Sequence, residues 1–189
     1  MRQEPSTPLQ VVLTIGHSTR SLEEFIHLLE VHGVEHLVDV RTIPRSRHNP
    51  QFNAEELASA LKRSGIGYGH KPGLGGLRHP RKDSVNTGWR NASFRGYADY
   101  MQTEEFRKNL EELIDLSKRQ QIAVMCAEAV PWRCHRSLIG DALVVRGIRV
   151  ENIMGPRRAE PHTLTPWAQV RGSRITYPAG SGASLNSGG

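Results

Sequence analysis

Residues 11–40 read VVLTIGHSTRSLEEFIHLLEVHGVEHLVDV, and this stretch predicts a strand, a helix and a second strand in succession. The β-branched run at 11–16 is typical of a short buried strand that a glycine ends. Ser21 followed by Glu24 has the spacing of a helix-capping box, and Gly33 supplies the helix stop. Because the connections are short, we expect the two strands to lie parallel in one sheet.

The same alternation continues through the rest of the chain. The sequence predicts, in order, a helix that begins after Asn53 and ends near Gly65, a short strand at 66–69, a helix at 97–119 broken near Thr103, a strand at 121–127, a helix at 134–145, a strand at 149–154 and an edge strand at 174–177. Residues 71–96 form a long Gly-, Arg- and His-rich loop, which is typical of a functional or mobile segment.

Together these elements predict an α/β protein. We expect a single three-layer domain over 11–178, with a mostly parallel sheet and helices on both faces. Residues 1–10 are expected to be a flexible N-terminal segment, and the Gly/Ser-rich stretch 179–189 a disordered tail.

The composition excludes several classes of protein. With 189 residues, 37% of them hydrophobic, the chain suits one domain and is too balanced for wholesale disorder. Two cysteines are too few for a disulfide scaffold. No apolar run reaches the roughly 18 residues of a membrane helix, and the first ten residues lack the apolar core of a secretory signal. A cytoplasmic protein with reduced thiols and no membrane association is therefore expected.

Positive charge is concentrated in one part of the chain. The net charge is +6, yet residues 41–95 alone hold eleven Lys and Arg against three Asp and Glu. Such a stretch indicates an anionic partner, which could be a nucleic acid, a nucleotide or another phosphate ester. A solvated basic face is an equally good interpretation of the charge alone, and the oligomeric state stays open.

Polar residues follow the predicted strands at their carboxyl ends. In a parallel sheet these ends meet at one rim, where α/β proteins bind their ligands. The residues expected at this rim are His17 and Ser18 after the first strand, Asp39, Arg41 and Arg45 at the second, and Cys126 and Glu128 at the third.

The densest group of reactive side chains is CAEAVPWRCHR at 126–136. A thiol at a helix N-terminus beside arginines has a lowered pKa, so Cys134 could be a thiolate near neutral pH. The free N–H groups of the same helix end favour an anion, which Arg133 and Arg136 could clamp.

Two known kinds of cysteine site fit this stretch poorly. A cysteine-dependent phosphatase loop has five residues between its Cys and its Arg, whereas six separate Cys126 from Arg133. A zinc site could be drawn from Cys126, Cys134 and His135 with His17 or Asp39. The local spacing matches no common zinc finger or ribbon, and the side chains of adjacent residues diverge. We therefore keep the anion site, predict no metal, and leave the cofactor unassigned.

A second class of function fits the basic segment. Its cations alternate with rings, namely Arg45, Arg47, Arg78, Arg81, Lys82 and Arg90 with His48, His79, Trp89 and Phe94. Basic groups contact phosphates and aromatic faces stack on unpaired bases, so a non-catalytic nucleic-acid-binding module is the alternative. No known nucleic-acid-binding signature accompanies these residues.

An ordered set of motifs runs through the chain. They are TIGHS at 14–18, DVR at 39–41 with Pro44 and Arg45, LGG at 74–76, FRGYADYM at 94–101, CAE at 126–128, CHR at 134–136 and LTPWA at 164–168. The set resembles a family known as domain of unknown function 488, from about Thr14 to Tyr177. The resemblance implies a small α/β domain of bacteria and archaea and brings no established activity with it.

These observations favour an enzyme, of open reaction class, that acts on a phosphate-bearing substrate such as a nucleotide or nucleic acid. The predicted catalytic residues are Cys126, Glu128, Cys134, His17 and Asp39. The predicted anion- and substrate-binding residues are Ser18, Arg41, Arg45, Arg133, His135 and Arg136. Glu128 or His17 would be the acid or base, and Cys126 or Cys134 the nucleophile, ligand or redox group. Whether the two cysteines pair stays open.

Overall fold

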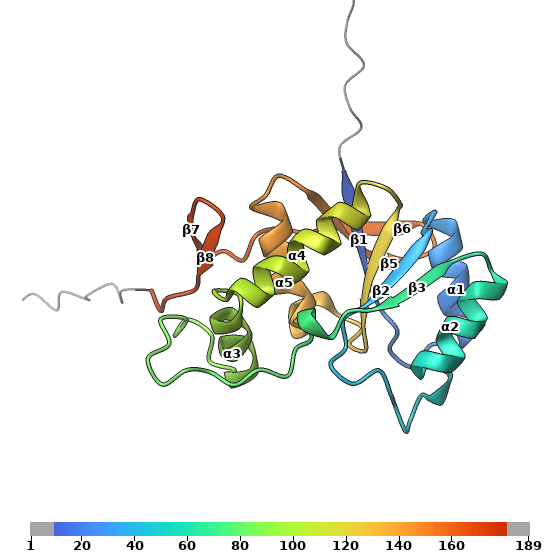
Figure 1. Ribbon diagram of the computed structural model, residues 1–189, viewed down its shortest axis with the longest axis horizontal. Helices are drawn as coiled ribbons and strands as arrows, with labels where there is room; N and C mark the ends of the chain where they lie inside the picture. The colour runs from blue at the N-terminus through green and yellow to red at the C-terminus, as the bar shows by residue number, and fades with distance from the viewer. Residues whose placement is uncertain (1–9, 181–189) are drawn as a thin grey trace, which may run out of the picture.

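A six-stranded sheet forms the middle layer of the molecule, in a computed structural model that describes residues 10–180 (Figure 1). The strand order is β3-β2-β4-β1-β5-β6. The strands are β1 (Val11–Gly16), β2 (His36–Asp39), β3 (Gly67–His70), β4 (Ile122–Cys126), β5 (Arg149–Gly155) and β6 (Arg158–Pro161). All neighbouring pairs are parallel except β5 and β6, which confirms the predicted mostly parallel sheet.

Helices cover both faces of this sheet, as predicted (Figure 1). One face carries α1 (Leu22–Val31) and α2 (Ala54–Arg63), and the other carries α3 (Ala92–Tyr100), α4 (Glu104–Ser117) and α5 (Arg136–Val144). The side chains of β1 alternate between the two cores: Leu13 and Ile15 pack with α1 and α2, whereas Val12 packs with α3, α4 and α5. The three-layer α/β class is therefore confirmed.

Local sequence signals explain where several helices begin and end. The Ser21 hydroxyl accepts the Glu24 N–H at 3.1 Å, so Ser21 caps α1. The predicted break near Thr103 is real: α3 ends before it, and its hydroxyl caps α4 by accepting the Phe106 N–H at 3.2 Å. The earlier helix begins at Ala92 and not at 97, because the Asn91 side chain caps it by accepting the N–H of Ser93 at 2.8 Å.

Two features near the C-terminus differ from the prediction. The stretch after β5 forms the antiparallel edge strand β6, which sequence periodicity could not reveal because RAEP is short and polar. The predicted edge strand at 174–177 is β8 (Arg174–Thr176), but it pairs with β7 (Gln169–Arg171) in a separate hairpin. The edge of the main sheet that β8 would extend is already covered by β6.

The long 71–91 segment is held in place by side chains of α3. Asp99 accepts hydrogen bonds from the Arg81 N–H, the Ser84 hydroxyl and the Asn86 amide, at 2.8, 2.6 and 2.7 Å. Tyr97 donates to the Leu74 carbonyl at 2.9 Å. The FRGYADYM motif thus anchors this segment against the sheet, where its residues 76 and 77 line a cavity.

Within residues 10–180, no helix is long and apolar enough to cross a membrane. Residues 1–9 and 181–189 lie outside the described part of the chain. The expectations of a flexible N-terminal segment at 1–10 and a disordered tail at 179–189 fall almost entirely on those residues.

Candidate functional site

A cavity of about 510 Å³ opens at the carboxyl ends of β1, β2 and β4, where the parallel-sheet rule placed the site. The predicted residues that line it are His17, Arg41, Arg45, Cys126, Glu128, Arg133, Cys134 and His135. Ser18 lines a smaller adjoining cavity of about 370 Å³. Asp39 and Arg136 do not line either cavity but lie buried behind their walls.

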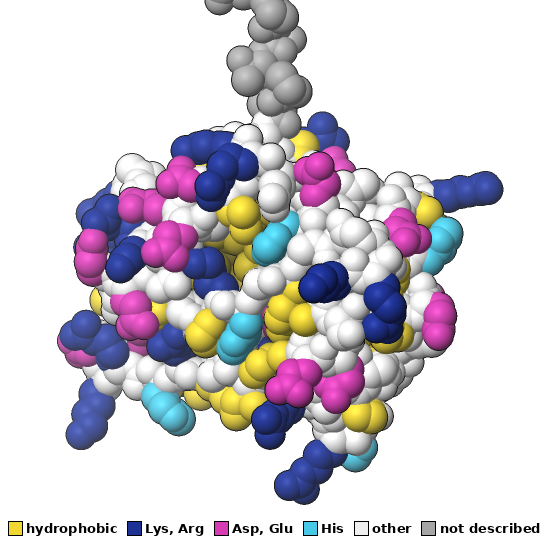
Figure 2. Space-filling model, turned by 45° about the vertical axis from the view of Figure 1, so that its right-hand side comes forward, with side chains coloured by type: hydrophobic (Ala, Val, Ile, Leu, Met, Phe, Trp, Pro, Cys, Tyr) yellow, Lys and Arg dark blue, Asp and Glu magenta, His cyan; other side chains and the backbone are white. Residues whose placement is uncertain are grey.

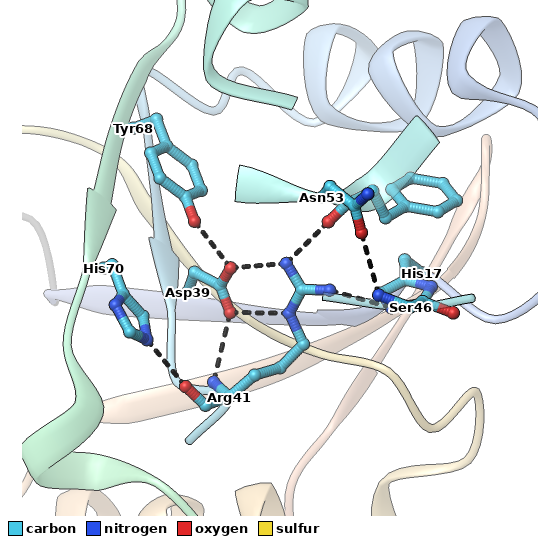
Figure 3. Close-up of polar contacts among 8 residues, drawn as sticks. His17, Asp39, Arg41, Ser46, Asn53, Tyr68 and His70 are labelled. Carbon is cyan, nitrogen blue, oxygen red and sulfur yellow. Dashed lines mark hydrogen bonds and ion pairs between the residues drawn. The ribbon is translucent and has the colours of Figure 1, made fainter. Parts of the chain in front are cut away.

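Asp39 and Arg41 form a buried ion pair (Figure 3). Arg41 Nε donates to Asp39 Oδ1 at 2.9 Å, and Arg41 Nη2 donates to Oδ2 at 2.6 Å. The Tyr68 hydroxyl donates to the same Oδ2 at 2.7 Å from β3, and burial together with this bond raises the pKa of Tyr68. Asp39 is fully buried, and both of its carboxylate oxygens accept hydrogen bonds from neighbouring side chains. We therefore assign it the role of orienting Arg41.

His17 lies between an aromatic ring and this guanidinium. Its ring stacks on Phe52 with centroids 4.3 Å apart, and its Nδ1 lies 2.8 Å from the Ser18 carbonyl oxygen. Since a carbonyl only accepts, Nδ1 carries the proton and Nε2 faces Arg41 Nη1 at 3.4 Å. Burial lowers the pKa of His17 and keeps the ring neutral. His17 must leave Arg41 before it can act as a base.

The two cysteine sulfurs lie 2.7 Å apart at the cavity wall, and both thiols are free and buried. Arg136 Nη1 donates to Cys126 Sγ at 3.2 Å. The hydrogen bond from Cys134 and the charge of Arg136 lower the pKa of Cys126 to about 7. The same bond to Cys126, together with burial, raises the pKa of Cys134.

Of the two thiols that the sequence left open as the reactive one, the geometry favours Cys126, because the Arg136 guanidinium contacts it. Both sequence signals for Cys134 are present, since it directly precedes the α5 cap His135 and its sulfur accepts the Arg136 N–H at 3.4 Å. The guanidinium of Arg136, however, contacts Cys126 and not Cys134, and the two sulfurs lie within hydrogen-bond distance of each other, where either can be the donor.

Arg136 has no carboxylate partner within residues 10–180, although it is only 2% exposed. Its Nη2 donates to the Ala129 carbonyl at 3.3 Å, and its buried Nε has no hydrogen-bond partner. A buried guanidinium without a counter-charge is strongly unfavourable. Cys126 Sγ, 3.2 Å from Arg136 Nη1, is the side-chain atom nearest to this guanidinium that can take a negative charge.

His135 is the second neutral imidazole of the site. Its Nε2 lies 3.2 Å from the Val40 carbonyl oxygen and so carries the proton, and its Nδ1 lies 3.6 Å from Cys134 Sγ. Burial lowers the pKa of His135 to about 4. A Cβ at Gly76 would lie 2.5 Å from this ring, which explains why the LGG motif ends in glycine.

The end of β1 packs closely against the loop at 126–129. A Cβ at Gly16 would lie 1.9 Å from the Glu128 carbonyl oxygen, so only glycine fits at this point of the TIGHS motif. Within residues 10–180, the backbone N–H groups of Ala127 and Ala129 donate to no other backbone group. These N–H groups are free to bind an anion or water.

The cavity mouth holds unpaired charge of both signs. The side chains of Arg45, Glu128 and Arg133 belong to exposed residues that line the cavity. None of them forms an ion pair within the part of the chain that the structure describes. The described residues also contain no group of three or more His, Cys, Asp and Glu side chains that could hold a metal ion.

Several residues of the site were not predicted. Phe52 and Tyr68 support His17 and Asp39, and Asn91, Ser93 and Phe94 line the cavity opposite the cysteines. Phe52 carried a usable signal, since it is the one aromatic residue in the basic loop at 41–52. The position of Tyr68 depends on the pairing of β3 with β2, which the sequence does not state.

Comparison with known proteins identifies a family for this chain. The model of the family described as Domain of unknown function DUF488 matches residues 21–143, nearly two thirds of the chain. This span holds the DVR, LGG, FRGYADYM, CAE and CHR motifs, whereas TIGHS and LTPWA fall outside it. Neither the curated proteins nor the solved structures yield a match. The chain belongs to the family of the domain of unknown function DUF488.

Proposed function

We propose that this protein is an enzyme that uses Cys126 as its nucleophile on an anionic, phosphate-bearing substrate. The proposal rests on the 3.2 Å contact between Arg136 Nη1 and Cys126 Sγ in a buried position where Arg136 has no other counter-charge. A thiolate is the reactive form of cysteine, and an electropositive setting that produces one near neutral pH is typical of nucleophilic cysteines.

The cavity supports an anionic substrate. Arg45 and Arg133 offer unpaired guanidiniums at its mouth, and Arg41 faces it with a geometry fixed by Asp39. Guanidiniums bind phosphate in a forked geometry, and free N–H groups such as those after Cys126 add further donors. A volume of about 510 Å³ suits a molecule of nucleotide size or the end of a nucleic acid.

Glu128 is the favoured acid or base of the proposed reaction. Its exposed side chain lines both cavities and makes no ion pair within residues 10–180, so its carboxylate is free to exchange protons with a bound ligand. His17 is less suitable because its Nε2 faces Arg41. Asp39 and Ser18 are assigned supporting positions.

The alternative, a non-catalytic nucleic-acid-binding module, lacks a specific observation in its favour. Several cations of the 41–95 segment are engaged within the protein: Arg41 with Asp39, Lys71 with Glu112, Arg81 with Asp83, and Arg78 over the Tyr100 ring. On the face shown in Figure 2, Lys and Arg side chains are interspersed with Asp and Glu. We expect a continuous basic surface for a binding module of this kind.

Protection of Cys126 by phosphate tests the proposal. The reduced protein is alkylated at constant ionic strength with and without inorganic phosphate, and the Cys126 peptide is quantified by mass spectrometry. We expect phosphate to slow alkylation of Cys126 in the wild type but not in a double variant, Arg45→Gln with Arg133→Gln. Arg119→Gln is the matched control, because Arg119 is exposed and precedes β4 at the opposite end of that strand.

A panel of nucleotides and phosphate monoesters then identifies the substrate. Cys126→Ser and Glu128→Gln should each abolish turnover, and Glu128→Gln, at an exposed position without an ion pair, should leave the melting temperature nearly unchanged. Absence of phosphate protection, together with turnover that survives Cys126→Ser, would contradict the proposal.

A further inference from the structure

The proposed nucleophile has a second thiol as its immediate neighbour, and the proposed function gives that thiol no task. Cys126 and Cys134 are separated by seven residues in the chain, yet their sulfurs lie 2.7 Å apart. This separation is well inside the contact distance of two unbonded sulfurs and only slightly longer than a disulfide bond of about 2.05 Å. A small movement would join them.

We propose that Cys126 and Cys134 form a redox-active dithiol that reduces small anionic disulfides, with Cys126 as the attacking thiol and Cys134 as the resolving thiol. This inference rests on the proposed role of Cys126 as a nucleophile. It names a further activity of the same cavity, thiol–disulfide exchange, and a further class of substrate.

The contacts of the two cysteines already differ in the protein without substrate, in a way that suits Cys126 as the attacking thiol and Cys134 as the resolving thiol. Arg136 Nη1 contacts Cys126 and not Cys134, so the positive charge stabilises a thiolate on Cys126. Cys134 donates its proton to that thiolate and stays a thiol, which is the form that does not attack disulfides. Both sulfurs reach the cavity, where a disulfide could approach Cys126.

The first step consumes the thiolate and frees Cys134. Cys126 Sγ attacks one sulfur of the substrate RS–SR, the S–S bond breaks, and RS⁻ leaves while a Cys126–S–SR mixed disulfide forms. Cys126 then no longer carries a negative charge, so it no longer holds the proton of Cys134. The Arg136 N–H, 3.4 Å from Cys134 Sγ, remains to stabilise a thiolate on Cys134.

The second step closes the intramolecular disulfide. Cys134 gives its proton to the departed RS⁻, either directly or through His135. The unprotonated His135 Nδ1 lies 3.6 Å from the Cys134 sulfur and can pass the proton on. The Cys134 thiolate attacks Cys126 Sγ and releases the second RS group as a thiolate, which takes a proton from water. The two protein thiols have supplied two electrons, the substrate has become two thiols, and the protein holds a Cys126–Cys134 disulfide.

The charges at the cavity mouth define the substrate class. Arg45 and Arg133 line the mouth without partners among the described residues and outweigh the one exposed carboxylate there, Glu128, so an anionic disulfide is attracted and a cationic one is repelled. Oxidised glutathione is a suitable anionic probe, and cystamine is a cationic disulfide of smaller size.

The test uses the full-length reduced chain at neutral pH with oxidised glutathione. Released thiol is measured, and the protein mass is read after acid quenching. We expect the wild type to release two glutathione molecules per chain and to lose the mass of two hydrogens. Cys134→Ser and Cys134→Ala should each release one glutathione and keep one bound on Cys126, whereas Cys126→Ser should release none.

Each contrary outcome has a distinct meaning. A wild type that stops at the mixed disulfide, or a Cys126→Ser variant that reacts through Cys134 at the wild-type rate, would overturn the assigned roles. Parallel alkylation of Cys126 separates the two proposals: fast alkylation without any disulfide overturns only the dithiol, whereas a Cys126 inert to both reagents overturns the proposed function as well. Equal rates with cystamine and oxidised glutathione at low salt would overturn the anionic substrate class.

Discussion

Arg136 and Cys126 face each other at 3.2 Å in the interior of the protein, joined by a hydrogen bond from Nη1 to Sγ. One comes from the first residue of α5 and the other from the last residue of β4, the central strand beside β1. Because no carboxylate reaches Arg136 within residues 10–180, a negative charge on the sulfur stabilises the buried guanidinium. Folding and reactivity are thus linked at this contact.

Replacing Arg136 tests that link. The hydrogen bond from Cys134 and, after it, the charge of Arg136 lower the pKa of Cys126; Arg136→Met removes the second cause and leaves no orphaned carboxylate behind. We expect the pKa of Cys126 to rise by a unit or more, so that its alkylation at pH 7 slows roughly tenfold or more, with little change in melting temperature. Arg119→Met, at an exposed position, is the control. An unchanged alkylation rate in Arg136→Met would show that Arg136 does not activate the thiol.

The buried Asp39–Arg41 pair should be a stability determinant. Asp39→Asn leaves the buried Arg41 without its counter-charge, and we expect a loss of about 3 kcal/mol in the free energy of unfolding, measured by denaturant titration. Asp83→Asn is a matched control, because Arg81 contacts Asp83 through the same two-pronged geometry in an exposed position. Surface pairs contribute little, so we expect no measurable change there. Equal effects of the two substitutions would contradict the account.

The neutral His135 predicts a pH dependence of stability. Its pKa is lowered to about 4 in the folded protein, so between pH 6.5 and 4 the unfolded chain binds the proton more readily than the folded one. The contribution of the neutral His135 to the free energy of unfolding is complete above pH 6.5 and is lost as the pH falls. At pH 5 the loss is about 2 kcal/mol. Denaturant unfolding across this range should show a shallower slope for His135→Gln than for the wild type. The exposed His79→Gln should keep the wild-type slope.

The glycine at the end of β1 should be irreplaceable. In Gly16→Ala the new Cβ would meet the Glu128 carbonyl oxygen at 1.9 Å and the Ala129 Cα at 2.9 Å, so the backbone of the loop after Cys126 must move. We expect a loss of about 2 kcal/mol in stability and slower alkylation of Cys126. Gly155→Ala, whose Cβ would have no neighbour within 4 Å, should change neither. Wild-type behaviour of Gly16→Ala would mean that this close approach is absent in solution.

Much of the fold could be predicted because its signals are local. Hydrophobic period, the Ser21 cap and the Thr103 break each depend on a few adjacent residues, and the carboxyl-end rule then places His17, Arg41 and Cys126 at one rim. The edge strand β6 escaped prediction because its polar residues show no apolar alternation.

The division of labour between the cysteines could not be read from the sequence. Along the chain Cys134 lies two residues from Arg136 and Cys126 lies ten residues from it, so spacing alone favours Cys134. The fold brings the end of β4 against the start of α5, and the guanidinium then reaches Cys126. Contacts of this kind depend on tertiary packing and not on spacing.

The most direct measurement is the alkylation rate of each cysteine as a function of pH, with the Cys126 and Cys134 peptides resolved by mass spectrometry. The account predicts that Cys126 reacts with an inflection near pH 7 and that Cys134 stays unreactive beyond its ordinary pKa of 9.0. An inflection for Cys126 at or above 9.0, or a Cys134 that titrates first, would contradict the central claim that Arg136 holds Cys126 as the thiolate of this site.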